Sequence, residues 1–191
     1  AALICAVLFC LGLLCALRFF GLPLLAPLGI SFYTLTLLGY LFDVYYEIGK
    51  VQTNYCKLLL FGSYFPTMIS GPILKYQEME GRMYAPHRLD YRQVTFGMQR
   101  MIWGFFKVLV ISERAATIAN QIFDHYRDYA GLPIWVGAVA FTFQLYANFS
   151  GCMDIVLGIS QCFGIELPEN FNAPFLSRTI AEYWRRWHIT L

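Results

Sequence analysis

The placement of its charges is the feature that most restricts what this chain can fold into. Four long tracts contain no Asp, Glu, Lys or Arg, and they cover residues 1–17, 19–42, 58–74 and 129–153. A helix needs roughly 17–25 predominantly apolar residues to cross a hydrocarbon layer of about 30 Å. The tracts therefore predict an all-α fold, a polytopic integral membrane bundle whose solvent is lipid.

The overall composition supports the same class. Hydrophobic residues make up 58% of the chain and charged residues 14%, whereas soluble domains contain about 45–50% apolar and about 25% charged residues. A water-soluble fold of this size would lack the charge to cover its surface. The net charge of +2 gives no reason to expect a nucleic acid, so the lipid bilayer is the expected partner.

The N-terminal part predicts two membrane helices followed by a broken one. We expect helices at 1–20 and 28–46, with a turn marked by Gly21 and Pro23 between them. The next apolar stretch contains prolines that an uninterrupted helix cannot accommodate. A broken or re-entrant helix, satisfied by protein or trapped water, is therefore predicted near Pro66–Pro72.

The second half predicts two further helical regions. Asp90 can cap a helix that begins amphipathic and becomes apolar throughout. Residues 113–128 contain enough charge to indicate a polar link. Residues 132–149 and 151–165 then predict either one long helix or two short ones.

Polar residues interrupt the longest charge-free tract and are candidate site residues. Gln144, Asn148 and Asp154 would lie at membrane depth, where unpaired polar groups are costly and often functional. They can equally hydrogen-bond neighbouring helices. The two readings are balanced for Gln144 and Asn148, whereas the carboxylate of Asp154 favours function. Lys107, in an apolar run, is expected to extend its amine toward the membrane surface.

The C-terminal run carries the strongest candidate for proton transfer. Thr179 followed by Glu182 is a capping box, so a helix should begin near residue 180. Continued helix would place Trp184, Trp187 and His188 on one face. An aromatic face with one imidazole could transfer protons, but these residue types also anchor interfacial helices. On the residues alone, the anchoring role is favoured.

Cysteine spacing gives no sign of a metal centre. None of the six cysteines forms a C-x-x-C pair, and most lie inside apolar tracts where Cys packs as a small hydrophobic residue. We therefore expect neither zinc nor a disulfide framework.

An ordered series of motifs resembles the membrane-bound O-acyltransferase family. It includes the run Tyr183-Trp-Arg-Arg-Trp-His188, and the complete set occupies residues 28–34, 43–45, 65–66, 69–73, 104–107, 143–154, 168–172 and 183–190. The series is most similar to the bacterial branch that O-acetylates alginate. Teichoic-acid D-alanyl transfer proteins are more distantly similar.

The resemblance implies an enzyme of the bacterial plasma membrane. It implies acyl transfer, with acetyl as the acyl group in this branch, from a cytoplasmic donor such as acetyl-CoA or an acyl carrier protein. The expected acceptor is a hydroxyl of an extracytoplasmic polysaccharide or of a partner acetyltransferase. No bound cofactor is expected.

The resemblance also assigns site residues. It maps His188 onto one of two recurring functional positions and places the second, the histidine generally taken as the catalytic one, after residue 191. The role of His188 is thus open between base, orienter and tunnel lining. Trp184, Trp187, Asn148, Asp154 and Gln144 are the residues predicted to line the substrate tunnel. We expect residues 1–191 to form one membrane-embedded domain that is incomplete at both ends and inactive alone.

Two alternatives remain open at this point. A membrane transporter also uses broken helices and intramembrane polar residues, although no internal repeat is visible in the sequence. A non-catalytic membrane scaffold is the other. Within the resembling family, D-alanyl transfer to teichoic acid is the alternative to acetyl transfer.

Overall fold

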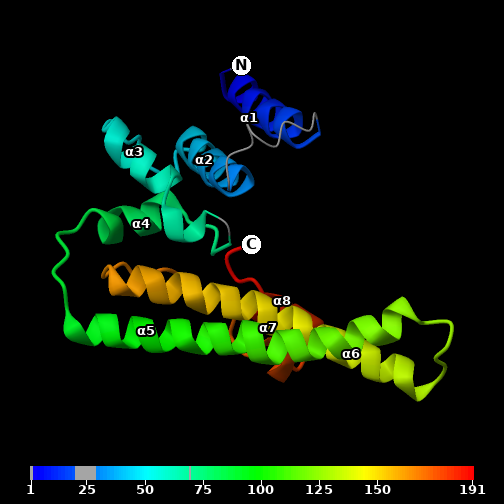
Figure 1. Ribbon diagram of the computed structural model, residues 1–191. Helices are drawn as coiled ribbons and strands as arrows, with labels where there is room; N and C mark the ends of the chain where they lie inside the picture. The colour runs from blue at the N-terminus through cyan, green and yellow to red at the C-terminus, as the bar shows by residue number, and fades with distance from the viewer. Residues whose placement is uncertain (1, 20–28, 69) are drawn as a thin grey trace.

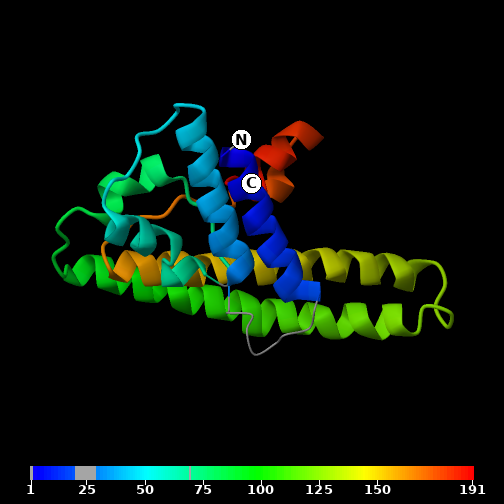
Figure 2. The ribbon, with the colours of Figure 1, turned by 90° about the horizontal axis from the view of Figure 1, so that it is seen from above.

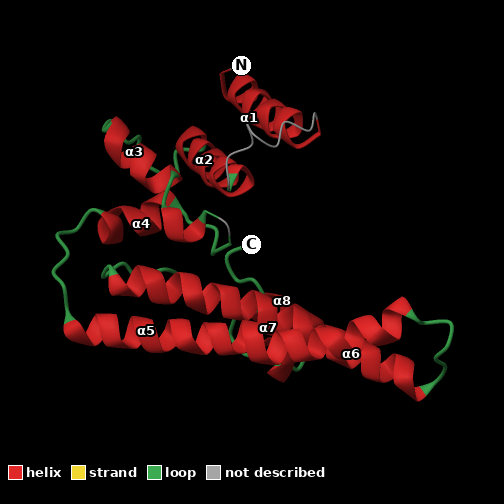
Figure 3. Ribbon diagram, in the orientation of Figure 1, coloured by secondary structure: helices red, strands yellow, loops and turns green. Residues whose placement is uncertain are grey.

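The computed structural model describes residues 2–19, 29–68 and 70–191, and helices dominate this part of the chain (Figures 1 and 3). No β-strand occurs in the described residues, where one isolated antiparallel bridge joins Phe171 and Trp187. In chain order the elements are α1 (Ala2–Phe19), α2 (Ile30–Tyr45), α3 (Tyr55–Gly62), η1 (Phe65–Thr67), α4 (Tyr76–Met83), α5 (Tyr91–Phe106), the π-helical η2 (Lys107–Ser112), α6 (Glu113–Asp124), α7 (Leu132–Cys162), η3 (Pro174–Leu176) and α8 (Ile180–Arg186). The all-α prediction is confirmed.

Several predicted boundaries are also confirmed. Helices α1 and α2 coincide with the first two predicted helices, although the turn assigned to Gly21 and Pro23 lies outside the described residues. Asp90 caps α5, because its carboxylate accepts a hydrogen bond of 2.9 Å from the backbone N–H of Arg92. Of the alternatives for 132–165, a single long helix is the one observed.

The predicted break in the third apolar stretch is present, and it begins before the first proline. Helix α3 ends at Gly62, and the hydroxyl of Ser63 donates to the carbonyl of Leu59 at 2.7 Å. A 3₁₀ turn containing the buried Pro66 follows, and α4 starts only at Tyr76. The local hydroxyl bond caps the last turn of α3, so the helix has ended by the time the chain reaches proline.

The polar link predicted at 113–128 is wrong, because α6 extends the preceding helix to Asp124. Ala119 and Ile122 of α6 are buried. Ile122 packs closely against Gly137 of α7, because a Cβ added to Gly137 would lie 2.9 Å from the Ile122 side chain. Tertiary packing of this apolar stripe outweighs the charges that suggested a link.

The framework of the structure is a long antiparallel pair in which α5, η2 and α6 run alongside α7 (Figures 1 and 2). Glycines let the two backbones approach closely. A Cβ added to Gly97 would lie 2.6 Å from the carbonyl oxygen of Gly158, and one added to Gly104 would lie 2.7 Å from that of Gly151. We call these four positions the glycine seam.

The segment η2 keeps both α5 and α6 in contact with α7. The buried positions along α5, η2 and α6 are Gly97, Gly104, Ser112, Ala119 and Ile122, and the first four are spaced seven, eight and seven residues apart. The wider step spans η2, whose i→i+5 bonding takes up one extra residue. The face that α5 presents to α7 is thereby continued by α6.

The shorter helices cover the C-terminal half of α7. Side chains from α3 and α4, among them Phe61, Tyr76 and Met79, form a core cluster with Met153 and Leu157 of α7. Helix α7 ends in a Schellman motif: the left-handed Gly164 has φ 77°, and the N–H of Ile165 donates to the carbonyl of Ser160 at 3.0 Å. This turn directs the chain toward the segment that carries the candidate site.

Among the described residues, two helices are long and apolar enough to cross a membrane, namely Tyr91–Asp124 and Leu132–Cys162. Few of their residues are buried inside the structure, and large apolar side chains such as Ile102, Trp103 and Trp135 are exposed. Exposed apolar surface on this scale is unfavourable in water. It suits contact with lipid or with other membrane helices.

Candidate active site

Beyond α8 the chain leaves helical geometry, and this determines where His188 lies. Trp187 is extended (φ −104°, ψ 122°) and His188 is left-handed (φ 50°). The shared helical face predicted for Trp184, Trp187 and His188 is therefore wrong. The N-terminal part of the prediction is confirmed, because the hydroxyl of Thr179 accepts from the N–H of Glu182 at 3.1 Å.

Backbone pairing explains the change of direction after Arg186. The N–H of Asn172 donates to the carbonyl of Arg186, and the N–H of Ile189 donates to the carbonyl of Asn170, both at 3.0 Å. Together with the Phe171–Trp187 bridge, these bonds join the segment before α8 to the segment after it. Non-local pairing thus replaces the helical bonds that the sequence periodicity predicts.

Asn170 is the polar centre of this pairing and is 1% exposed. Its Oδ1 accepts from Nδ1 of His188 at 3.1 Å, from the N–H of Thr190 at 3.1 Å and from the hydroxyl of Thr190 at 2.9 Å. The same hydroxyl accepts from the N–H of Ile73 at 3.0 Å. The amide of Asn170 therefore connects the imidazole to the broken segment that follows α3.

Aromatic rings lie along one side of the imidazole. The ring of Phe149, on α7, meets the His188 ring edge-to-face with centroids 5.0 Å apart. Phe171 lies 5.0 Å from both Phe149 and Trp187, so these three rings form one wall, in which Phe149 is the ring that contacts the imidazole. Trp184 does not belong to this wall, because it is 62% exposed and among the described aromatic rings it meets only Tyr183, edge-to-face.

Burial of the imidazole has an electrostatic consequence. Desolvation lowers the pKa of His188 below its ordinary value, because a low-dielectric environment disfavours the charged form. The side chain is therefore neutral near pH 7, where one of its ring nitrogens can accept a proton.

Asp154 lies in a charged cluster that connects α5, α7 and the segment before α8. Its carboxylate accepts from Nε of Arg100 at 3.0 Å and also contacts the amine of Lys107. Arg100 reaches Glu169 with two further bonds, of 2.7 Å and 2.6 Å. Lys107 donates to the hydroxyl of Ser150 at 3.3 Å, so the prediction that its amine extends to the membrane surface is wrong.

Gln144 and Asn148 lie one turn apart on α7. The Oε1 of Gln144 is buried without a hydrogen-bond partner in the described structure, and the residue's backbone carbonyl accepts from the Ser112 hydroxyl at 3.1 Å. Asn148 is exposed, and its Oδ1 accepts a bond of 3.7 Å from the thiol of Cys152. Neither residue is brought to His188.

The structure thus assembles a set that differs from the predicted one. His188 and Trp187 lie together, and the residues that complete their surroundings are Asn170, Thr190 and Phe149. One feature of the sequence could have identified part of this set. Asn170 lies between two prolines that exclude a helix, and buried polar residues outside helices often serve as hydrogen-bonding centres.

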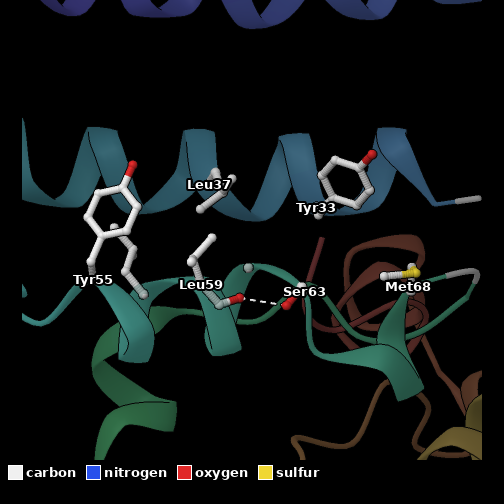
Figure 4. Close-up of a pocket in the computed structure, with 8 residues that line it drawn as sticks. Tyr33, Leu37, Tyr55, Leu59, Ser63 and Met68 are labelled. Atoms are coloured by element: carbon white, nitrogen blue, oxygen red, sulfur yellow. Dashed lines mark hydrogen bonds between the residues drawn. The ribbon is translucent and has the colours of Figure 1, made fainter. Parts of the chain in front are cut away.

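A cavity of about 340 Å³ lies elsewhere, between α2 and α3 (Figure 4). Tyr33 and Leu37 of α2 face Tyr55 and Leu59 of α3 across it. Its lining is almost entirely apolar and contains none of the predicted site residues.

Comparison with known proteins gives the same family as the motif series. The sequence profile of the membrane-bound O-acyltransferase family matches residues 49–191. The chain is 36% identical to a probable alginate O-acetylase of Pseudomonas aeruginosa, over 88% of this chain and 32% of that protein. It is 34% identical to a peptidoglycan O-acetyltransferase of Helicobacter pylori, over 91% of this chain and 38% of that protein.

A third relative carries a different name. A teichoic acid D-alanyltransferase of Bacillus subtilis is 30% identical, over 88% of this chain and 43% of that protein. The chain therefore spans about a third to two fifths of the length of the curated relatives that it matches.

Proposed function

This chain belongs to the membrane-bound O-acyltransferase family, and we propose that the protein transfers an acetyl group to a hydroxyl group of a cell-envelope polymer. Relatives named for alginate or peptidoglycan O-acetylation are 34–37% identical, against 28–30% for the D-alanyltransferases. This difference favours acetyl over D-alanyl. The observation that carries the proposal is the family match together with a neutral imidazole held in an aromatic wall.

The chemistry requires one group that accepts and returns a proton. The hydroxyl oxygen of the acceptor attacks the carbonyl carbon of an acyl thioester, a C–O bond forms, and the C–S bond breaks. The hydroxyl proton passes to the departing sulfur, and His188 takes part in this transfer together with the second histidine that the family resemblance places after residue 191. Such general base catalysis contributes about 10²–10⁴-fold to a rate. Phe149 supports this role, because its ring lies 5.0 Å from the imidazole ring and covers one side of it. Water excluded from that side cannot hydrolyse the donor there.

Donor, acceptor and location follow from the same proposal. The donor is acetyl-CoA or an acetylated carrier protein on the cytoplasmic side of the bacterial plasma membrane. The acceptor is an extracytoplasmic polysaccharide or a partner acetyltransferase that completes the transfer. The two long apolar helices support a membrane location.

Reconstitution in lipid vesicles tests the proposal. The full-length protein, supplied with radiolabelled acetyl-CoA or labelled carrier on one side and polysaccharide on the other, should give an alkali-labile acetyl ester on the polymer. His188→Ala should lower the initial rate of ester formation by at least about 100-fold. His125→Ala is the matched control, because His125 is an exposed imidazole at the end of α6.

Three results would overturn the proposal. Full activity of His188→Ala would remove the imidazole from the mechanism. Ester formation with D-alanine but not with acetyl would assign the other acyl group. Passage of a substrate through the vesicle without any covalent change would identify a transporter.

A further inference from the structure

Residues 166–169, which lead from α7 toward the candidate site, lack backbone support. Among the described residues, none of their backbone N–H or C=O groups bonds to another backbone group, and Pro168 has no N–H to donate. Leu167 is buried, but apolar burial is non-directional. The precise place of this segment must therefore be set by polar side chains that bind it.

Two arginines from different helices bind the segment. Arg82 of α4 donates to the backbone carbonyl of Glu166 at 3.0 Å. Arg100 of α5 binds the carboxylate of Glu169 with both of its terminal nitrogens, at 2.7 Å and 2.6 Å. The Nε of the same guanidinium donates to Asp154 of α7 at 3.0 Å. Arg100 thus joins both helices of the pair to the segment.

Glu169 also balances the charge of the helix pair. Lys107 and Arg100 share the carboxylate of Asp154, so these three residues alone carry one excess positive charge. The Arg100 side chain is only 28% exposed, where an unbalanced charge is costly. Glu169 supplies the second carboxylate. One contact therefore both neutralises the cluster and holds the segment.

This contact lies next to the residue that binds the imidazole. Asn170 follows Glu169 directly, and its Oδ1 meets Nδ1 of His188 at 3.1 Å. Successive Cα atoms are held about 3.8 Å apart. A displacement of Glu169 would therefore be passed to Asn170 and from there to the imidazole.

We propose that Arg100 is a positioning residue, which fixes the segment 166–169 through Glu169 and thereby sets the place of His188 in the site. This rests on the proposed function in one respect, that His188 belongs to the site. It does not depend on which step of the transfer His188 serves.

The role requires the shape of the guanidinium as well as its charge. The three nitrogens of Arg100 lie in one plane and reach two carboxylates at once. The amine of a lysine is a single point charge on a flexible stem. Arg100→Lys would therefore keep the charge and lose the geometry that joins α7 to the segment.

Acetyl transfer by the full-length protein in lipid vesicles is the first readout. Arg100→Lys and Glu169→Gln should each lower the rate at least about tenfold, because a misplacement of about 1 Å can cost about 100-fold. The double variant should fall no further than the worse single variant, since both remove the same contact.

Glu78→Gln is the matched control and should keep the full rate. Glu78 is 58% exposed, against 57% for Glu169, and its ion pair with Lys75 is local in the sequence. The two carboxylates thus differ in what they join and not in their exposure.

The ¹⁵N resonances of the imidazole are the second readout, and they need no activity. In protein labelled at its histidines, the resonances that vanish in His188→Gln identify His188. They should shift or broaden in Arg100→Lys and in Glu169→Gln, and stay in place in Glu78→Gln. If Arg100 served stability alone, they would be unchanged below the melting temperature.

The outcomes separate this inference from the proposed function. Unmoved resonances in Arg100→Lys and Glu169→Gln overturn the positioning role, whatever the rate. An unchanged rate in both variants overturns it as well if His188→Ala is inactive. Shifted resonances with an active His188→Ala overturn the proposed function and leave the positioning role standing. If Arg100→Lys fails to fold, Glu169→Gln decides, because an exposed carboxylate contributes little to stability.

Discussion

The helix pair formed by α5, η2, α6 and α7 and the C-terminal segment 165–191 solve the same problem in different ways. Both place polar groups among apolar surroundings. The helix pair does so with compensated charges, Asp154 against Lys107 and Arg100, on regular backbone. The C-terminal segment uses a neutral amide, Asn170, on irregular backbone.

This difference indicates what each region is built for. Charges that neutralise one another in a low-dielectric environment fix neighbouring elements but are costly to disturb. A neutral amide orients a neighbouring imidazole without committing it to the charged state. The helix pair, which forms the rigid framework, therefore contains the paired charges. In the C-terminal segment, which is proposed to move a proton, no charged side chain among the described residues directly contacts the imidazole of His188.

The largest effect should come from removing the shared carboxylate. Asp154→Ala leaves Lys107 and Arg100 without it, and both lie largely inside the structure. Breaking such a pair costs about 3–5 kcal/mol, which thermal unfolding in detergent would measure. Glu169→Gln is the matched control, since Glu169 is 57% exposed and its loss should cost about 1 kcal/mol or less. Equal effects of both variants would contradict the distinction between the regions.

The next largest effect should come from the glycine seam. In Gly104→Val the new Cβ would lie 2.7 Å from the Gly151 carbonyl oxygen, and overpacking of this kind costs about 1–3 kcal/mol. The measurement is again thermal unfolding. Gly81→Ala, in α4, is the control, because no atom lies within 4 Å of the added Cβ and alanine favours helix. An unchanged melting temperature in Gly104→Val would show that the two helices of the pair can move apart without loss of stability.

A smaller effect is expected in the C-terminal segment. Thr179→Ala removes the hydroxyl that accepts from the N–H of Glu182, and loss of an N-cap costs about 1 kcal/mol. Hydrogen exchange should show faster opening of α8 with little change in α7. Thr179→Ser, which keeps the hydroxyl, is the control. Faster exchange in both helices would mean that the segment is not an independent unit.

The smallest effect concerns pH. Desolvation lowers the pKa of His188 in the folded state below its unfolded value of about 6.5. At a pH between these two pKa values, the unfolded chain therefore binds more protons than the folded chain. The stability contribution is fully present above about pH 6.5 and is lost as the pH falls below it. Melting temperatures on both sides of that pH should converge in His188→Gln but not in His125→Gln. An unchanged pH dependence in His188→Gln would refute the assignment.

Local signals in the sequence were sufficient for much of the fold. The Asp90 and Thr179 caps act through bonds to residues two and three positions away, and the break near Pro66 follows from the backbone chemistry of proline. Apolar tracts of sufficient length predicted helices wherever no long-range contact opposed them. These features could be read without knowing what the chain packs against.

The site depended on contacts that periodicity does not contain. Lys107 and Asp154 are 47 positions apart, and Asn170 meets His188 across the whole of α8. Nothing in the spacing of Trp184, Trp187 and His188 indicates that bonds to residues 170–172 would end the helix at Arg186. The charges of 113–128 were likewise outweighed by packing of Ile122 on α7.

The π-helical segment η2 has a consequence for how this region can evolve. A helix turns by about 100° per residue, so the extra residue held in η2 sets the rotational phase of everything after it. Losing one residue there would swing Ala119 and Ile122 away from α7 while leaving every side chain before Lys107 in place. Changes of residue type should therefore be tolerated in η2 more readily than changes of residue number, whereas the turn at 125–131, which lies beyond α6, can vary in length without altering that phase.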